Sequence, residues 1–282
     1  MAELPEVHTI SNDLNNLVKD YTIDDVKVLS NYRILPDKDT FIKQVKGKPI
    51  TQVTRVAKNI IIELGDNLNI GLHLAMTGQI LVRNGNDKQP NWTHIILLLR
   101  SNTDTQTIYY TDMRMFGKIT LMDKEQLQVL KDKYGPEPID PNADPADFYE
   151  RIRSKRTSIK NAILDQAVIS GLGNIYATDA LFLARIHPET PTQKMSSDMA
   201  NRLFESAKNI LLEGIEHRGS TLADKMYVDI YGKEGTQQNY FRVYGKQDCP
   251  NCATKLEFKK VGGRGTYFCP KCQNLSVQEQ LF

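Results

Sequence analysis

The chain has 282 residues, of which 40% are hydrophobic and 25% are charged. This composition is ordinary for a globular protein of about two domains, and it excludes a disordered tail. The sequence contains no run of 18 apolar residues, so a membrane span is excluded. The acidic start without an apolar segment argues against a signal peptide, and we therefore expect a cytoplasmic protein.

The net charge of +2 is unevenly distributed along the chain. Residues 1–150 carry 17 Lys or Arg and 21 Asp or Glu, whereas residues 151–282 carry 19 and 13. A basic C-terminal half indicates a local face that binds a polyanion, although an imbalance of this size also occurs without one.

Hydrophobic spacing predicts a helix over 7–18, followed by a region of strands that continues to residue 122. Turn-forming clusters at 65–67 and 84–87 separate these strands, and a short helix over 39–46 interrupts them. The expected strands cover 23–29, 49–56, 59–64, 68–75, 94–100, 107–111 and 118–122. This order predicts an antiparallel sandwich or flattened barrel rather than alternating β–α units.

A proline-rich stretch that starts at Gly135 marks a linker to a second, helical region. Helices are expected over 146–153, 158–168, 174–185 and 196–217, and residues 225–240 are expected to form a mobile loop. The fold class is therefore α+β with several domains. We assign 1–134 to the β-sandwich, 135–244 to the helical domain, 245–275 to a metal-binding hairpin and 276–282 to a tail.

The cysteines form two closely spaced pairs, and no cysteine precedes them. In a reducing compartment, two Cys-x-x-Cys turns predict a tetrahedral zinc site rather than disulfides. Four thiolates leave no open position, so the ion is structural. The ligands are Cys249, Cys252, Cys269 and Cys272. The Gly-rich tip between the pairs projects Arg264, which suits contact with a nucleic-acid backbone, or else it is a solvated basic tip.

A basic segment and a glycine turn lie in the helical region. Five Lys or Arg residues and no acids occur in 151–160, among them Lys155, and a Gly-x-Gly turn precedes Asn174. Asn is a favourable N-cap, and the free amides of a helix start bind phosphate. The alternative is a helix hairpin with a solvated basic face, and the pattern alone does not decide between the two.

The N-terminus offers a possible nucleophile. If Met1 is removed, which a small second residue allows, Ala2 presents a free α-amine beside Glu3. A neutral amine can form a Schiff base with a sugar aldehyde, and an adjacent carboxylate can move protons for it. Without further support, the amine is simply a solvated chain terminus.

Several residues near strand ends are ambiguous by pattern alone. Lys58 precedes an apolar strand, where a lysine is usually solvated. Met76, Arg114 and Phe116 are core residues or, alternatively, a wedge that enters a duplex and replaces an extruded base.

Taken together, these segments resemble the formamidopyrimidine-DNA glycosylase family of base-excision repair, within the Fpg/Nei superfamily. The resemblance covers nearly the whole chain. Its motifs run in order from Glu-Leu-Pro-Glu-Val at 3–7, through Ala-Lys at 57–58, His-Leu-x-Met-x-Gly at 73–78 and Tyr-Thr-Asp-x-Arg-x-Phe-Gly at 110–117, to Gly-Pro-Glu-Pro at 135–138, Gly-Leu-Gly-Asn-Ile-Tyr at 171–176 and Arg-Gly-Thr-x-Phe-Cys-x-x-Cys at 264–272.

The resemblance implies an N-terminal helix and β-sandwich, a helical domain with a helix–two-turns–helix motif, and a zinc-binding β-hairpin. It implies a monomer that binds double-stranded DNA containing oxidised purines or abasic sites. The damaged purine, such as 8-oxoguanine or a formamidopyrimidine, would be flipped out of the duplex. Met76, Arg114 and Phe116 would fill the gap, with Arg114 facing the orphaned cytosine.

The resemblance also implies the chemistry of a bifunctional DNA glycosylase and AP lyase. The amine of residue 2 would attack the sugar, and β- and δ-elimination would then cut the strand. Glu3 would move protons at the sugar, Lys58 would bind a phosphate and assist elimination, and Arg264 would support the second elimination. Lys155 and Asn174 would hold the DNA backbone, and the loop over 225–240 would cover the flipped base.

Four positions depart from the family pattern. Ala2 stands where the family has proline, Trp92 where it has a DNA-contacting histidine, Met115 where it has a second arginine and Asp179 where it has glutamate. His94 keeps the second histidine of its loop and is expected to contact DNA. Because of Ala2, one alternative is a lesion-binding protein with weak or no catalysis. Because of Trp92 and residues 225–240, another is a glycosylase with a shifted substrate choice.

Overall fold

The computed structural model describes residues 2–83 and 88–275. The chain divides into two compact units, which we describe separately. The first contains the chain up to Lys131 together with His217–Gln238, and the second contains Asp132–Glu216 together with the residues from Asn239 onward.

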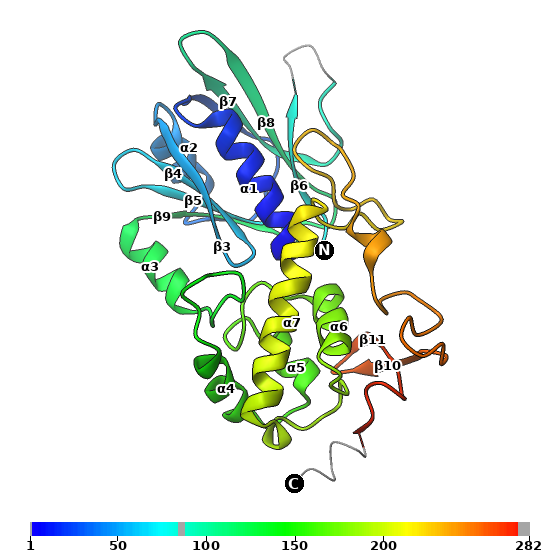
Figure 1. Cartoon of the computed structure of the whole chain (residues 1–282). Helices are drawn as coiled ribbons and strands as arrows, with labels where there is room; N and C mark the ends of the chain where they lie inside the picture. The colour runs from blue at the N-terminus through cyan, green and yellow to red at the C-terminus, as the bar shows by residue number, and fades with distance from the viewer. Residues whose placement is uncertain (1, 84–87, 276–282) are drawn as a thin grey trace. The chain divides into compact units, whose positions relative to one another are not determined.

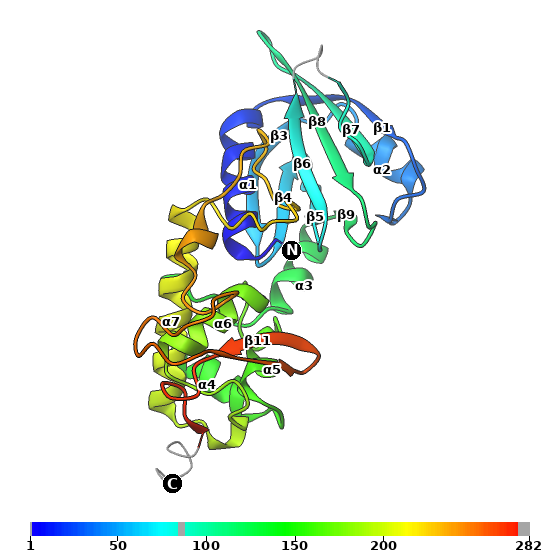
Figure 2. The same cartoon turned by 90° about the vertical axis from the view of Figure 1, so that its right-hand side faces the viewer.

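Two sheets form the first unit (Figures 1 and 2). Their strands are antiparallel except for the short parallel pair β2–β9. One sheet has the order β1 (Thr22–Val28), β7 (Thr93–Arg100), β8 (Thr105–Asp112) and β6 (Gly78–Arg83). The other has the order β2 (Ile34–Leu35), β9 (Lys118–Met122), β5 (Asn69–His73), β4 (Asn59–Leu64) and β3 (Ile50–Val56). The predicted antiparallel sandwich is confirmed.

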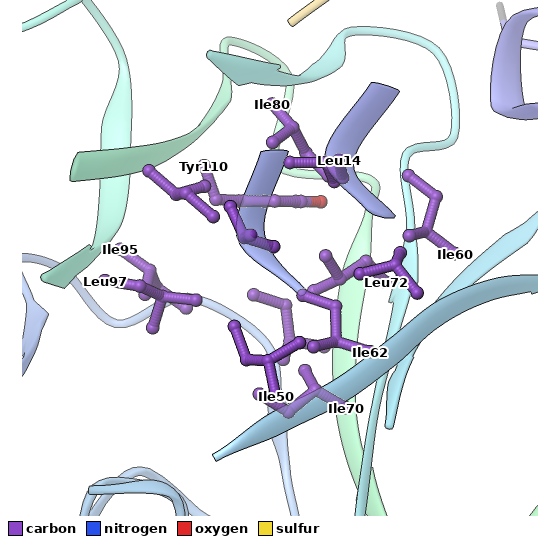
Figure 3. Packing of buried hydrophobic residues seen from close by; sticks show 14 of the residues in the cluster. Leu14, Ile50, Ile60, Ile62, Ile70, Leu72, Ile80, Ile95, Leu97 and Tyr110 are labelled. Carbon is purple, nitrogen blue, oxygen red and sulfur yellow. The ribbon is translucent and has the colours of Figure 1, made fainter. Parts of the chain in front are cut away.

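The core of this unit lies between the sheets. Ile80, Ile95 and Leu97 from the first sheet face Ile62 and Ile70 from the second, and all five are buried (Figure 3). Branched aliphatic side chains suit this position because they pack well on pleated, half-buried surfaces.

Three helices accompany the sandwich: α1 (Leu4–Val18), α2 (Lys38–Val45) and α3 (Lys124–Asp132). Helix α1 carries Val7, Ile10, Leu14 and Val18 at helical spacing, and these side chains are buried in the same core. Pro5 is tolerated in the first turn because a helix leaves its first amides unpaired. The apolar spacing therefore fixes which face of α1 is buried.

The second unit is helical. Its helices are α4 (Pro145–Arg153), α5 (Ile159–Leu164), α6 (Asn174–Leu183) and α7 (Ser197–Glu216), with a 3-10 turn, η1, at Thr192–Lys194. Helix α6 is buried on nearly all sides and packs against α7 and α5. A two-stranded hairpin of β10 (Glu257–Val261) and β11 (Arg264–Phe268) completes the unit. Among the described residues, no helix has both the length and the apolar character needed to cross a membrane.

Several elements differ from the prediction. Strand β6, strand β2 and helix α3 were not predicted, and predicted helix 158–168 ends at Leu164. A second 3-10 turn, η2, covers Gln237–Tyr240 within the expected loop. The turn at 84–87 and the tail at 276–282 lie outside the described residues.

Residues 225–240 were assigned to the helical domain as a mobile loop, but most of them belong to the sandwich unit. Tyr227 and Ile230 are buried in the sandwich core. The Val82 amide donates to the Ile230 carbonyl at 2.8 Å, and the Gln79 side-chain amide donates to the Met226 carbonyl at 3.2 Å. Two apolar anchors and these hydrogen bonds to β6 hold the segment on the sheet.

Candidate active site and nucleic-acid interface

The start of α1 holds the two N-terminal site residues. Glu3 is the N-cap and is 1% exposed, and its amide donates to the Glu6 carboxylate at 2.8 Å in a capping box. Ala2 is partly buried and packs against the sandwich core. The helix start therefore holds a carboxylate and the backbone of residue 2 in one fixed arrangement, while Met1 lies outside the described residues.

Glu6 also joins α1 to the segment 217–238. Its other carboxylate oxygen accepts from the Ser220 amide at 2.7 Å and from the Ser220 hydroxyl at 3.0 Å. Nearby, Arg218 pairs with Asp13 of α1 and, at 2.9 Å, with the buried Asp229. The start of this segment is thus fastened to the helix that carries Glu3.

Lys58 lies in the tight turn between β3 and β4, where Ala57 has a left-handed backbone. The adjacent Asn59 pairs with His73 at the end of β5. Burial lowers the pKa of His73, and the positive charges of Lys118 and Lys58 lower it further. The strand register therefore places Lys58 beside an imidazole that is neutral at neutral pH.

Met76, Arg114 and Phe116 lie on two neighbouring loops. Met76 follows β5, and Arg114 and Phe116 follow β8. Gly78 pairs with Asp112, so the two loops leave the sheet side by side. Met76 and Phe116 are 38% and 56% exposed, and the Arg114 guanidinium lies 4.7 Å from the centre of the Phe116 ring. These side chains are exposed loop tips rather than core residues.

Trp92 and His94 lie beside these loops but in different surroundings. Trp92 is 61% exposed, and its carbonyl accepts from the Asp112 amide at 3.0 Å. His94 is buried and stacks on Tyr32, and its ring nitrogens lie 2.7 Å from the Ser30 hydroxyl and 2.8 Å from the Asp112 carbonyl. The side chain of His94 supports the loop from beneath, which does not favour its predicted contact with DNA.

In the second unit, Lys155 follows α4 and Asn174 begins α6. Lys155 pairs with Asp165 at 2.9 Å and lowers the pKa of that carboxyl. Gly173, not Asn174, is the N-cap of α6. The Asn174 side-chain amide instead donates to the Gly265 carbonyl at 3.0 Å, so this residue links the helix start to the β10–β11 hairpin.

The four cysteines gather at the base of that hairpin. Their sulfurs all lie within 4.8 Å of one another, with 3.8 Å between Cys249 and Cys272 and 3.5 Å between Cys252 and Cys269. Zinc–sulfur bonds of about 2.3 Å place tetrahedral sulfurs about 3.8 Å apart. The cluster therefore has the size and the donor set that zinc requires.

The hairpin is attached to the helices around it. Lys259 pairs with Glu189 at 2.7 Å, and the Phe268 ring packs edge to face on His187. The buried Gln273 donates to the Ile186 carbonyl at 2.9 Å. These contacts fix the orientation of the exposed Arg264 at the start of β11 relative to α5 and α6.

The predicted site residues thus fall into two sets. Those of the first unit are Ala2, Glu3, Lys58, Met76, Trp92, His94, Arg114 and Phe116; those of the second are Lys155, Asn174, Arg264 and the four cysteines. Sequence reasoning missed Asp112, Glu6 and Arg218. The first two lie inside motifs that were recognised, but only their neighbours were given a role.

Three family models match the chain. They are the formamidopyrimidine-DNA glycosylase N-terminal domain at residues 1–119, the formamidopyrimidine-DNA glycosylase H2TH domain at 134–226, and the zinc finger found in FPG and IleRS at 246–275. Together with the sulfur geometry, the third match assigns one structural Zn²⁺ to the four cysteines.

Individual relatives match over nearly the full chain. The formamidopyrimidine-DNA glycosylase of Chloroflexus aurantiacus is 37% identical, with 97% of this chain and 98% of the relative covered. Lactococcus lactis Fpg in complex with DNA containing an abasic site has a TM-score of 0.88 at 33% identity, with 97% and 100% covered. The same enzyme with DNA containing Fapy-dG has a TM-score of 0.87 at 33% identity, with 96% and 100% covered. The chain belongs to the formamidopyrimidine-DNA glycosylase family.

Proposed function

We propose that this protein is a bifunctional DNA glycosylase and AP lyase that excises oxidised or ring-opened purines from double-stranded DNA. The observation that carries the proposal is the capping box at the start of α1, which holds the buried Glu3 next to residue 2. The Lactococcus lactis structures with abasic-site and Fapy-dG DNA support the substrate class.

In this proposal the neutral amine of Ala2 attacks C1′ of the flipped nucleotide, and the bond from C1′ to the base breaks as the base takes up a proton. The bound nitrogen then loses a proton, and the C1′–O4′ bond breaks as O4′ takes one up, which leaves a protonated Schiff base. The Schiff base withdraws electrons and makes the C2′ proton acidic. Loss of that proton expels the 3′ phosphate, and a second elimination expels the 5′ phosphate. Glu3 transfers protons at the sugar.

The remaining site residues bind DNA. Lys58 and Arg264 contact phosphates near the lesion and assist the two eliminations, and Lys155 and Asn174 hold the DNA backbone. Met76, Arg114 and Phe116 fill the space of the flipped base, which offsets part of the unstacking cost of a few kcal/mol. Their exposure on adjacent loops supports this role.

Borohydride trapping tests the nucleophile. With protein whose intact mass shows that Met1 has been removed, reduction on duplex DNA containing 8-oxoguanine should give a covalent adduct at Ala2, located by peptide mass. The Glu3→Gln variant should trap at least about tenfold more slowly, since a positioned general acid or base contributes about 10²–10⁴-fold. Glu125→Gln, at the exposed start of α3, is the matched control and should behave as the wild type. Trimmed protein that binds the lesion but forms no adduct would refute the proposal.

A second candidate function is lesion binding with little catalysis, and Ala2 favours it. A primary amine gives a Schiff base that can lose its proton, which weakens it as an electron sink. If this function is correct, the wild type will bind damaged duplex without cutting it over hours, and Ala2→Pro will introduce strand cleavage. Equal cleavage by both proteins would exclude it.

A further inference from the structure

The carboxylate of Asp112 is buried beneath the two loops that carry Met76, Arg114 and Phe116. Asp112 is the last residue of β8 and is 0% exposed. It takes part in none of the proposed chemical steps. A buried carboxylate needs several hydrogen bonds to remain charged.

The hydrogen bonds to Asp112 reach both ends of one loop. The Arg114 amide donates to Oδ1 at 3.3 Å, and the Gly117 amide donates to Oδ2 at 2.9 Å. The loop 113–116 lies between Asp112 and Gly117, and it contains Arg114 and Phe116. One side chain therefore closes the loop that presents the guanidinium and the phenyl ring.

Asp112 also binds the other loop. The Thr77 hydroxyl donates to Asp112 Oδ1 at 2.5 Å, and its oxygen accepts from the Arg114 amide at 3.0 Å. Thr77 directly follows Met76. Asp112, Thr77 and the Arg114 amide thus form a closed triangle that couples the position of Met76 to that of Arg114.

Aromatic side chains complete the surroundings of the carboxylate. The Tyr32 hydroxyl donates to Oδ2 at 2.7 Å and lies 2.9 Å from the Tyr110 hydroxyl. Burial opposes the charge of Asp112, but the hydrogen bonds from Thr77, Tyr32 and the two loop amides lower its pKa. Gly117 is required here because a Cβ would lie 2.3 Å from the Tyr110 hydroxyl and 2.5 Å from the Tyr32 hydroxyl.

We propose that Asp112 is a positioning residue that holds Met76, Arg114 and Phe116 in one arrangement before DNA binds. This inference rests on the proposed function, in which those three side chains occupy the space of a flipped base. With the loops already fixed, opening the duplex does not also have to order them. Substitution of Asp112, Thr77 or Tyr32 should therefore slow the steps that depend on those three side chains and leave the other steps unchanged.

The test compares duplex and single-stranded substrates. The variants are Asp112→Asn, Thr77→Val and Tyr32→Phe, with Thr77→Ser as the conservative rescue. Asp24→Asn, in the exposed part of β1, is the matched control. Single-turnover excision of 8-oxoguanine opposite cytosine requires base flipping, whereas cleavage at an abasic site in single-stranded DNA does not.

We expect Asp112→Asn to slow duplex excision by about ten- to hundredfold, because a hydrogen bond to a charged group is lost. Single-strand cleavage should stay within about twofold. Thr77→Val should show the same selective loss in smaller measure, and Thr77→Ser should recover it. Circular dichroism in urea verifies that each variant is folded.

A binding measurement separates this inference from the proposed function. Affinity for duplex DNA with a tetrahydrofuran abasic analogue should weaken in the Asp112 and Thr77 variants, and their preference for cytosine opposite the analogue should diminish. Both effects are expected whether or not the protein cleaves DNA. Equal loss on duplex and single-stranded DNA, or variants that keep wild-type affinity and preference, would overturn the positioning role. An inactive wild type with these binding effects intact would refute only the proposed function.

Discussion

We expect His73, at the end of β5, to make the stability of the sandwich depend on pH. Burial and the charges of Lys118 and Lys58 lower the pKa of His73 in the folded protein. An unfolded histidine titrates at about 6.5, so below that pH the unfolded chain binds a proton that the folded chain rejects. The contribution of His73 to the free energy of unfolding is therefore fully present above about pH 6.5 and is lost progressively as the pH falls below it.

Urea unfolding between pH 7.5 and 5.5, with zinc saturating, measures this effect. The wild type should lose free energy of unfolding across the range, and His73→Gln should lose less of it. His187 has a pKa lowered mainly by burial, so His187→Gln is a second variant with a change in the same direction. If the free energy of unfolding depends on pH identically in the wild type and in His73→Gln, folding does not lower the pKa of His73.

At the scale of elements, the tip of the β10–β11 hairpin gives a matched pair of glycines. Gly262 and Gly263 both have left-handed backbones, with φ of 57° and 78°. A Cβ on Gly262 would lie 1.8 Å from Asn161 Oδ1 in α5, whereas a Cβ on Gly263 would meet nothing within 4 Å. Alanine strains the backbone at both positions, but only at Gly262 must the Asn161 side chain or the tip also shift to make room.

Gly262→Ala should therefore reduce DNA affinity more than Gly263→Ala. A shift of the tip at Gly262 also displaces Arg264, which lies two residues farther along the chain. Each variant loses about 1 kcal/mol of stability from the left-handed backbone, and overpacking at Gly262 adds about 1–3 kcal/mol. Fluorescence anisotropy on lesion duplex and urea unfolding measure both quantities. Equal losses for the two variants would mean that the contact with Asn161 does not position the tip.

The elements that sequence patterns predicted are those with a clear period or clear end signals. The spacing of Val7, Ile10 and Leu14 gave α1, and alternating turn clusters gave most strands. Strand β6 was missed because Gly78 opens it and its apolar run is short. The segment 217–238 could not be assigned to its unit, since its anchors are long-range pairs such as Arg218 with Asp13, which leave no local pattern.

At the scale of the whole molecule, the order of the motifs predicted the family correctly and named most residues of the candidate site, because the residues of each motif lie close together in the sequence. The network around Asp112 could not be predicted in the same way. Its members Tyr32, Thr77 and His94 come from different strands and loops, and only the strand register brings them together. Roles that depend on tertiary hydrogen bonds therefore appear only in the structure.

Zinc removal should act on one part of the molecule. The ligands lie in the second unit, and the core between the two sheets lies in the first. Structural zinc contributes about 10–16 kcal/mol of binding free energy in zinc-finger peptides, which is also folding free energy. Chelation should therefore remove amide protection from β10 and β11 in hydrogen exchange, with protection of strands β4, β5 and β8 unchanged.

Affinity for DNA should also fall on chelation, because Arg264 is no longer held in place. Added Zn²⁺ should restore the affinity whereas Mg²⁺ should not, since thiolates select zinc. Loss of protection throughout the sandwich, or a hairpin that stays protected without metal, would contradict this division.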